Sequence, residues 1–393
     1  MVKDKNILYV GGFELPDRNA AAQRVIANAK LFSTLGYKVF FIGVYTNSSY
    51  NPLIKKRVIE GLEYHSKPQK YPYSKSDWFK FITDLKFVRN VVENDLKANV
   101  DIIVAYNYPA VSLWKLLKYC NKNNIKLIAD VTEWYQPEGN LFFKLIKGFD
   151  TYLRMNILHK RVDGLITISK YLTEFYKSSN NIIQLPPLID KNSQKWNKVD
   201  YIPNDICNLI YVGSPGNGIK DSLDTIIQSL SRIKSRTRDF NLKIIGITKE
   251  EYFINFGVEI IPKNIIDNVF FEGRKSHRVA IEEIKNSDYS IFLRKNNLVN
   301  KAGFPTKFVE SISCGTPVLT NESSNITQFL KEGELGYLID SSTDNKLDIS
   351  LIKAINSDKE LLIEIKNKCY LYNKFHFNSY KNEFNGFINN LFN

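Results

Sequence analysis

Cysteine and histidine are scarce in this sequence of 393 residues, with four of each. Neither type is clustered, and no C-x-x-C pair occurs. These absences argue against a disulfide framework, a cysteine zinc site and a histidine metal cluster, and they fit a reducing compartment. No apolar run reaches ~18 residues, so we expect no membrane-spanning helix. The first residues lead into a strand without the apolar run of a signal peptide, and we therefore predict a cytoplasmic protein.

Three sequence signatures of phosphate or metal binding are also missing. No G-x-G-x-x-G follows the first predicted strand, so a dinucleotide site is poorly supported. The glycine-rich turn from Gly213 to Asp221 lacks the Gly-Lys-Ser/Thr ending of a P-loop. No D-x-D triplet occurs, although such carboxylates often hold Mg²⁺ or Mn²⁺ against a diphosphate. We therefore expect neither a metal nor an organic cofactor.

Positive charge is in excess, with 54 lysines and arginines against 41 acidic residues and a formal net charge of +13. This balance indicates an anionic partner: nucleic acid, a membrane surface or a phosphorylated substrate. From about Leu141 to Arg161, apolar residues trace one helix face with basic residues interspersed. Such a helix can lie on an anionic lipid surface, which would make the protein peripheral at the inner face of the plasma membrane, or it can pack on a sheet. Both interpretations stay open.

Predicted strands and helices alternate along the chain. The first strand, 6–10, ends at a glycine pair, and a helix capped by Asn19 follows at about 20–35. After the polar stretch 191–204 the alternation restarts, which indicates an α/β fold with two domains. The further predicted strands are 37–45, 102–104, 125–129, 164–169, 208–212, 242–247, 269–271, 288–293 and 317–320, and the predicted helices include 78–92, 141–160, 223–233 and 379–392.

Candidate site residues follow two strands of the first half. Gly11 and Gly12 end the first strand, and Asp130 and Glu133 come after the strand predicted at 125–129. Ligands of open α/β sheets bind at the carboxyl ends of the strands, so these residues are expected to share one edge. Taken alone, a glycine pair or an aspartate at such a place fits a turn equally well.

Two features of the second half suit a diphosphate and a sugar. The turn before the helix 223–233 contains three glycines and Lys220, so backbone amides and an ammonium can converge on a phosphate. A second helix, predicted from Thr306 to Cys314, has Lys307 in its first turn, and a helix N-terminus of this kind is an anion site. Glu310, one turn further, is either a solvated residue or an acceptor for sugar hydroxyls. Together these features describe a nucleotide sugar.

The stretch from Asn300 to Asn321 resembles the donor-binding motif of glycosyltransferase family 4, whose fold is GT-B. That motif has a first Glu, seven residues, a second Glu and a small-Gly-x-Pro turn. Glu310 stands at the second Glu, residues 314–317 form the turn, and Ala302 stands where the first Glu is usual.

The glycine-rich turn also resembles the family's phosphate-binding turn. Lys220 matches its lysine, and Ser214 stands where its arginine is usual. Arg294, just past a predicted strand, is our candidate for supplying the charge that Ser214 does not.

The resemblance implies a GT-B architecture of two Rossmann-like α/β domains facing a central cleft. The acceptor-binding domain would be residues 1–190, completed by a C-terminal helix at about 376–393 that crosses back to it. The donor-binding domain would be residues 205–375, with 191–204 as the linker.

The resemblance also implies roles for residues. Lys220 would stabilise the departing diphosphate, Glu310 would hold the ribose hydroxyls, and the nucleobase would pack near Gly273. The acids after the strand 125–129 would touch the acceptor or the transferred sugar. The implied catalytic residues are Asp130, Glu133 and Lys220. The implied donor-binding residues are Gly11, Gly12, Gly213, Ser214, Lys220, Gly246, Phe271, Gly273, Arg274, Arg294, Ala302, Gly303, Phe304, Pro305, Thr306, Lys307 and Glu310.

The activity that the resemblance implies is transfer of a hexose or N-acetylhexosamine from a nucleotide-diphosphate sugar, such as a UDP-sugar, to a glycan or lipid-linked acceptor. Retention of anomeric configuration, independence of metal, and a place in cell-surface glycan assembly (capsule, exopolysaccharide, lipopolysaccharide or teichoic acid) are implied as well.

Two alternative functions compete with this activity. A nucleotide-sugar 2-epimerase shares the fold, but such enzymes use paired acids and histidines, and this chain is poor in histidine. A basic, non-enzymatic nucleic-acid binder would explain the charge but not the phosphate-suited turns at strand ends, and no recognised nucleic-acid motif is present. We therefore expect no nucleic-acid partner.

Overall fold

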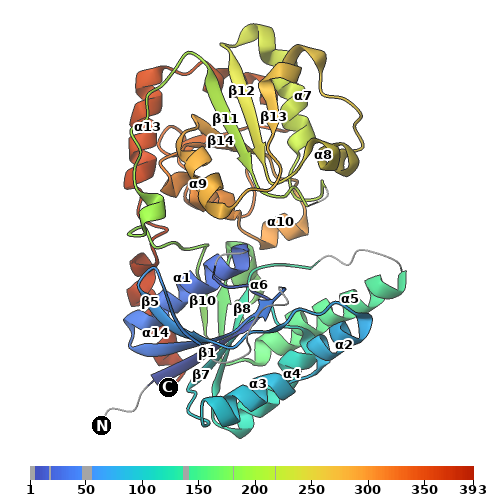
Figure 1. The fold of residues 1–393 in the computed structure, drawn as a ribbon, viewed down its shortest axis with the longest axis vertical. Coiled ribbons are helices and arrows are strands. Elements are labelled where there is room, and N and C mark those ends of the chain that lie inside the picture. The colour runs from blue at the N-terminus through green and yellow to red at the C-terminus, as the bar shows by residue number, and fades with distance from the viewer. Residues whose placement is uncertain (1–4, 17–18, 47–54, 136–140, 180, 217) are drawn as a thin grey trace. The chain divides into compact units, whose positions relative to one another are not determined.

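The computed structural model describes residues 5–16, 19–46, 55–135, 141–179, 181–216 and 218–393 (Figure 1). The start of the chain and Asn217 of the glycine-rich turn lie outside this description. The chain divides into two compact units, Met1–Asp190 with His376–Asn393, and Lys191–Phe375. The stretch expected as a linker, 191–204, therefore clusters with the second unit. Among the described residues, no helix is both long and apolar enough to cross a membrane.

Within the described residues of the first unit, eight strands form one sheet in the order β10-β9-β8-β7-β1-β2-β5-β4. All neighbours pair in parallel except β4 and β5, an antiparallel hairpin that the sequence patterns did not predict. Chain order reverses between β1 and β7, which defines the switch point of this sheet. The strands are β1 Lys5–Gly11, β2 Tyr37–Ile42, β4 Lys55–Ile59, β5 Leu62–Ser66, β7 Ile102–Tyr106, β8 Lys126–Val131, β9 Gly164–Thr167 and β10 Ile182–Gln184, with a separate pair, β3 Val44–Tyr45 and β6 Gln69–Lys70.

Helix α1, Ala20–Thr34, begins where predicted, because the Asn19 side chain accepts the Ala22 N–H at 2.8 Å. The helix predicted at 78–92 is interrupted. Asp84 is extended, and its carboxylate accepts the Lys86 N–H, which ends one helix and starts the next. The other helices are α2 Lys75–Thr83, α3 Lys86–Asn90, η1 Val91–Asp95, α4 Ala110–Lys122, α5 Leu141–Leu153, η2 Arg154–Leu158, η3 His159–Arg161, α6 Lys170–Phe175, η8 Phe377–Tyr380 and α14 Lys381–Asn390.

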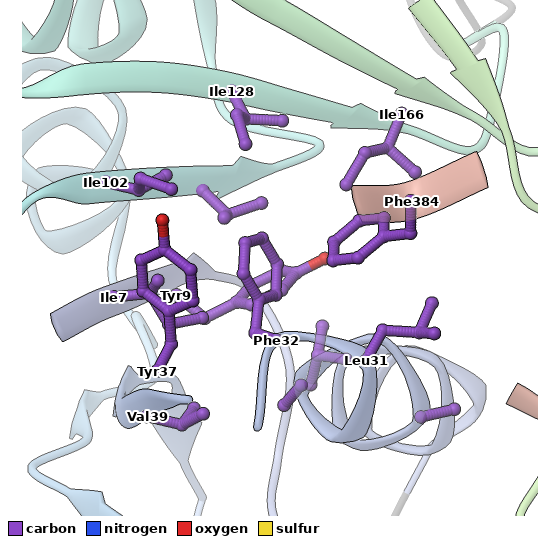
Figure 2. Close-up of a cluster of buried hydrophobic side chains, with 14 of the residues drawn as sticks. Ile7, Tyr9, Leu31, Phe32, Tyr37, Val39, Ile102, Ile128, Ile166 and Phe384 are labelled. Atoms are coloured by element: carbon purple, nitrogen blue, oxygen red, sulfur yellow. The ribbon is translucent and has the colours of Figure 1, made fainter. Parts of the chain in front are cut away.

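The C-terminal helix α14 completes the core of the first unit (Figure 2). Phe384 meets Phe32 of α1 edge to face, with ring centroids 4.8 Å apart. The Asn181 side chain donates to the Phe387 carbonyl oxygen at 3.0 Å and ties α14 to the chain just before β10. These contacts bury the apolar faces of α1 and α14 together against one face of the sheet.

Within the described residues of the second unit, six parallel strands follow the order β13-β12-β11-β14-β15-β16, with the switch point between β11 and β14. The strands are β11 Cys207–Val212, β12 Phe240–Ile245, β13 Val269–Phe271, β14 Tyr289–Phe292, β15 Val318–Thr320 and β16 Gly336–Leu338. The helices are η4 Gln194–Trp196, α7 Leu223–Ile233, η5 Lys234–Arg236, α8 Lys249–Phe256, η6 Lys263–Asn268, α9 His277–Lys285, α10 Leu298–Ala302, α11 Thr306–Ser313, η7 Ile326–Gln328, α12 Asp344–Ile355 and α13 Lys359–Leu371.

Candidate active site

Three neighbouring strands of the second unit are each followed by a glycine, which leaves the backbone at this edge of the sheet without side chains. Strands β11, β12 and β13 each lead into a glycine with positive φ: Gly213, Gly246 and Gly273. The Gly246 N–H donates to the Gly273 carbonyl oxygen at 2.8 Å, and a Cβ at Gly246 would lie 2.4 Å from the Gly213 carbonyl oxygen. Only glycine fits so close a backbone approach. The predicted donor residues Phe271 and Arg274 flank this edge, Phe271 packing on Tyr252 and Arg274 being exposed.

The glycine-rich turn that follows β11 is pinned to the segment after β14. The Lys220 N–H donates to the Pro215 carbonyl oxygen at 3.1 Å, and the Lys220 carbonyl oxygen accepts from the Asn300 side chain at 2.8 Å. The Lys220 side chain is half-buried, with its aliphatic stem against Gly216. The turn is therefore held by its backbone, and Ser214 stays exposed on it.

Asp221, at the end of this turn, organises a buried ion cluster. Its carboxylate accepts hydrogen bonds from the Tyr211 hydroxyl at 2.7 Å and the Lys307 ammonium at 2.5 Å, and Arg294 Nε lies 3.7 Å away. Burial by itself raises the pKa of Asp221, but the Lys307 and Arg294 charges outweigh it and hold that pKa below its ordinary value. Two cations thus meet one anion, and the cluster has a positive excess of one charge.

Lys307 and Arg294, both predicted as donor ligands, belong to this cluster. The Lys307 ammonium lies 4.2 Å from the centre of the Tyr211 ring and 3.2 Å from the point where a Cβ of Gly213 would stand. Burial lowers its pKa, and the Asp221 carboxylate opposes that shift. Arg294 is buried and donates to Asn300. Both cations therefore lie directly beneath the glycine-rich turn.

Helix α11 offers an open N-terminus beside the cluster. It begins at Thr306 after Pro305, and within the described residues no side chain caps it. The Gly303 N–H is already used, since it donates to the Val299 carbonyl oxygen and ends α10, while Phe304 packs on Phe308 and Phe329. The amides of the first turn of α11 are consequently the ones suited to an anion. Ala302, in place of the family's first Glu, is fully buried.

Glu310 has a partner that the sequence did not reveal. Its Oε1 lies 3.1 Å from Nε2 of His277, and each side chain is about one fifth exposed. His277 is the first residue of α9, and its ring meets the buried Trp196 edge to face. The pair joins α9 to α11 and fixes the direction of the Glu310 carboxylate. A separation of 33 residues leaves no periodic signal for such a pair.

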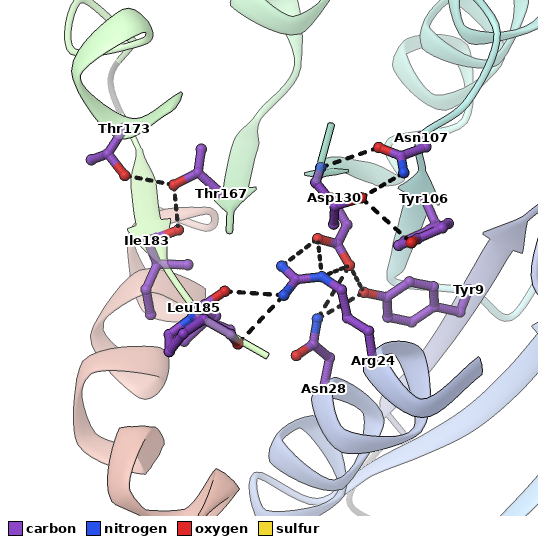
Figure 3. Close-up of polar contacts among 12 residues, drawn as sticks. Tyr9, Arg24, Asn28, Tyr106, Asn107, Asp130, Thr167, Thr173, Ile183 and Leu185 are labelled. Carbon is purple, nitrogen blue, oxygen red and sulfur yellow. Dashed lines mark hydrogen bonds and ion pairs between the residues drawn. The ribbon is translucent and has the colours of Figure 1, made fainter. Parts of the chain in front are cut away.

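In the first unit, Asp130 lies within β8 and is completely buried (Figure 3). Its carboxylate accepts from the Tyr9 hydroxyl at 2.6 Å, the Arg24 guanidinium at 2.7 Å and the Asn28 amide at 3.2 Å. Arg24 also donates to the Leu185 carbonyl oxygen at 3.0 Å. The carboxylate of Asp130 is thus fully engaged with protein groups, and this arrangement favours a positioning role over direct contact with a substrate.

The other predicted residues of the first unit lie at the end of β1 or just after β1 and β8. Gly11 pairs with Tyr106 of β7, and a Cβ there would lie 2.7 Å from the Tyr106 carbonyl oxygen. Gly12 is exposed, with open space around its Cβ position. Glu133 is half-buried, two residues beyond β8. In the part of the chain that the structure describes, no three His, Cys, Asp or Glu residues come together as a metal site.

The second unit also matches a family model. Residues 212–370 match the model described as "Glycosyl transferases group 1". This segment includes the glycine-rich turn, the ion cluster and α11. One curated protein, the DNA-dependent protein kinase catalytic subunit of Dictyostelium discoideum, is 28% identical over 108 residues, which are 28% of this chain and 2% of that protein. The chain thus spans a very small part of that relative.

The fold over nearly the whole chain is similar to solved structures. One is a sucrose-phosphate synthase from Thermosynechococcus elongatus, with TM-score 0.73, 15% identity and 99% of each chain covered. Another is the HepE protein of Anabaena in complex with UDP and glucose, with TM-score 0.63, 12% identity, and 98% of this chain and 99% of that chain covered. A third is the lipopolysaccharide outer core galactosyltransferase WaaB in its apo form, with TM-score 0.59, 16% identity and the same coverage.

At these identities the solved structures establish the fold, and the family match establishes the activity class. The two Rossmann-like sheets and their full-length likeness confirm the predicted α/β, GT-B fold. Residues 212–370 therefore belong to glycosyltransferase group 1, and the protein has the GT-B fold of a nucleotide-sugar-dependent glycosyltransferase.

Proposed function

We propose that this enzyme transfers a hexose or N-acetylhexosamine from a UDP-sugar to a glycan or lipid-linked acceptor, with retention of anomeric configuration and without a metal. The observation that supports this most directly is the positively charged Asp221 cluster beneath the glycine-lined edge of the second sheet. It lies at the switch point, where ligands of open α/β sheets bind. The solved complex of HepE with UDP and glucose supports uracil as the nucleobase of the donor.

In this proposal, the leaving diphosphate binds between the glycine-rich turn and the first turn of α11. Lys220 and the α11 amides donate to it, while Lys307 and Arg294 contribute a fixed positive field from below. Glu310, oriented by His277, accepts from the ribose hydroxyls. Phe271 and Gly273 border the nucleobase. These groups act by electrostatic stabilisation of the departing diphosphate, so no divalent ion is needed.

We assign the acceptor to the first unit, through Glu133, with Asp130 as a positioning residue. The likeness to a lipopolysaccharide galactosyltransferase supports a place in cell-surface glycan assembly, and a cytoplasmic enzyme attached to the inner face of the plasma membrane fits such acceptors.

A panel of UDP-, GDP- and ADP-sugars tests the proposal in two steps. Thermal-shift protection identifies the donor, and release of the nucleoside diphosphate on addition of an acceptor measures transfer. We expect protection by a UDP-sugar that is lost in Lys220→Gln and kept in Lys346→Gln, a matched loss of one exposed lysine elsewhere in the second unit. Conversion of the donor to its epimer without an acceptor would instead identify a 2-epimerase, and absence of protection by every nucleotide sugar would contradict the donor site.

A further inference from the structure

Helices α2, α4 and α5 of the first unit are neighbours (Figure 1). Each of them exposes large apolar side chains. Helix α4 contacts both of the others. The Lys115 ammonium donates to the Thr83 carbonyl oxygen at the end of α2, and the Asp150 carboxylate of α5 accepts the Ala110 N–H. We call the exposed surface of these three helices the α2–α4–α5 face. Its exposed apolar residues include Trp78, Phe79, Trp114, Leu145, Phe149 and Tyr152.

Helix α5 turns its apolar stripe to solvent instead of the core. Leu145, Phe149 and Tyr152 follow the spacing of one helix face and are 65%, 68% and 59% exposed. A surface helix of a globular protein normally buries its apolar face against the core. Helix α2 behaves alike, since none of its residues is buried. Both helices thus expose the surface that usually anchors a helix to its protein.

The charges around these side chains have one dominant sign. The three helices contain seven lysines, all exposed, and two aspartates. Both aspartates serve the local fold: Asp77 completes the capping box of α2 with Ser74, and Asp150 holds the start of α4. The Lys118 ammonium lies 3.8 Å from the centre of the exposed Trp114 ring. Lysines beside exposed tryptophans and leucines are typical of surfaces that enter a lipid headgroup layer.

We propose that the α2–α4–α5 face docks on an anionic lipid bilayer. Lysine ammonium groups would meet the headgroup phosphates, while the apolar side chains would enter the boundary of the acyl chains. A second copy of the chain fits poorly, because a twofold contact would place two faces of equal positive charge together. Nucleic acid would use the lysines but leaves Leu145 and Phe149 exposed to water. This proposal rests on the membrane attachment proposed above and names the surface that makes it, and its test does not depend on sugar transfer.

Vesicle flotation with the full-length protein, without donor or acceptor, tests the proposal. Vesicles of phosphatidylcholine containing about one third phosphatidylglycerol should bind the protein, and pure phosphatidylcholine should bind much less. Raising the salt concentration from about 0.1 M to about 0.5 M should release it. Lys144→Gln with Lys147→Gln should weaken binding roughly thirtyfold, since each lysine near such a surface contributes about a fivefold factor.

Matched variants separate this face from charge or hydrophobicity in general. Lys331→Gln with Lys353→Gln, exposed lysines of the second unit, should leave binding unchanged. Leu145→Ser with Phe149→Ser should lose binding, whereas Ile254→Ser with Leu371→Ser, at even more exposed positions of the second unit, should keep it. Unchanged melting temperatures show that each variant is folded. Absence of vesicle binding, equal loss in the control variants, self-association abolished by the face variants, or salt-sensitive DNA binding without vesicle binding would each overturn the proposal.

Discussion

The switch point of each sheet contains the same polar arrangement. In the first unit, Tyr9 stands two residues before Gly11 and donates its hydroxyl to Asp130, whose charge is met by Arg24. Burial, followed by the charge of Asp130, raises the pKa of Tyr9 well above its ordinary value, so the hydroxyl stays a donor. One cation and one anion balance in a completely buried cluster. Such a cluster fixes β1, α1 and β8 together and offers no charge to a ligand.

In the second unit, Tyr211 stands two residues before Gly213 and donates to Asp221. Here the carboxylate meets both Lys307 and Arg294. The added cation lies under a turn of glycines, where an anion can approach the backbone. The two clusters therefore differ in net charge by one unit, and only the second lies beside a glycine-rich turn. Charge balance, more than the presence of buried polar groups, thus distinguishes a cluster that only holds the fold together from one that can attract an anion.

The largest effect is expected from removing the cation of the charge-balanced Asp130 cluster. Arg24→Met leaves Asp130 as an uncompensated buried charge, which should lower the free energy of unfolding of the first unit by about 3–5 kcal/mol. Urea denaturation combined with hydrogen exchange of the β1 and β8 amides measures this. Lys307→Met should cost clearly less, because Arg294 still faces Asp221. Equal losses of unfolding free energy in the two variants would show that the two clusters do not differ in charge balance as described. Adding Asp130→Asn to Arg24→Met should recover part of the stability.

The next effect concerns two glycines that follow strands, one in each unit. Gly246 has φ of 120°, and an added Cβ would lie 2.4 Å from the Gly213 carbonyl oxygen. Gly246→Ala should therefore destabilise the second unit by roughly 2–4 kcal/mol, from strain and overlap with backbone. Gly12→Ala, in open space, should change stability by less than about 0.5 kcal/mol. Thermal unfolding of both variants checks the contrast, and a stable Gly246→Ala protein with unchanged donor protection would show that the edge tolerates a side chain.

Sequence reasoning predicted the parts of this molecule that follow local rules. The strand-ending glycines, the Asn19 cap and the start of α11 were found because turns, caps and apolar periodicity are read within a few residues. The fold class follows from their alternation and is confirmed. The β4–β5 hairpin was missed because its two strands are short and contain several charged residues. The break at Asp84 was missed because the apolar pattern continues through it.

The buried polar clusters around Asp130 and Asp221 could not be predicted, because they join distant parts of the chain. Asp130 was expected at a binding edge, but Arg24 and Asn28, one turn apart in α1, enclose it from more than 100 residues away. That pair of polar residues was the available signal. Asp221 was seen as one residue of a turn, and nothing local indicated that it organises Lys307. The role of each individual donor residue stays a prediction.

A smaller effect is expected from the carboxylate assigned to the ribose. Glu310→Ala should weaken donor affinity ten- to hundredfold, corresponding to ~1.5–3 kcal/mol for charge-assisted hydrogen bonds, with the fold intact. His277→Ala should raise the donor KM by about fivefold with little change in kcat, since it only orients Glu310, and His277→Gln, whose amide can still donate, should restore most of that loss. Isothermal titration and initial rates measure both. Wild-type donor affinity in a folded Glu310→Ala protein would remove the ribose assignment.

The smallest effect should come from removing divalent ions. Transferases that use Mg²⁺ or Mn²⁺ hold the ion with carboxylates so that it bridges the diphosphate oxygens. At the second switch point the acid is Asp221, and its carboxylate is already shared by Lys307 and Arg294, so a divalent ion there would meet net repulsion. The same fixed positive charge can neutralise the leaving diphosphate directly. Release of nucleoside diphosphate should consequently continue in excess EDTA at nearly the untreated rate.

If chelation abolishes turnover and Mn²⁺ restores it, the excess positive charge of the Asp221 cluster is not what stabilises the leaving group. The half-buried Glu133 of the first unit then becomes the acid to test as a ligand, because Asp130 is enclosed by Arg24 and Tyr9.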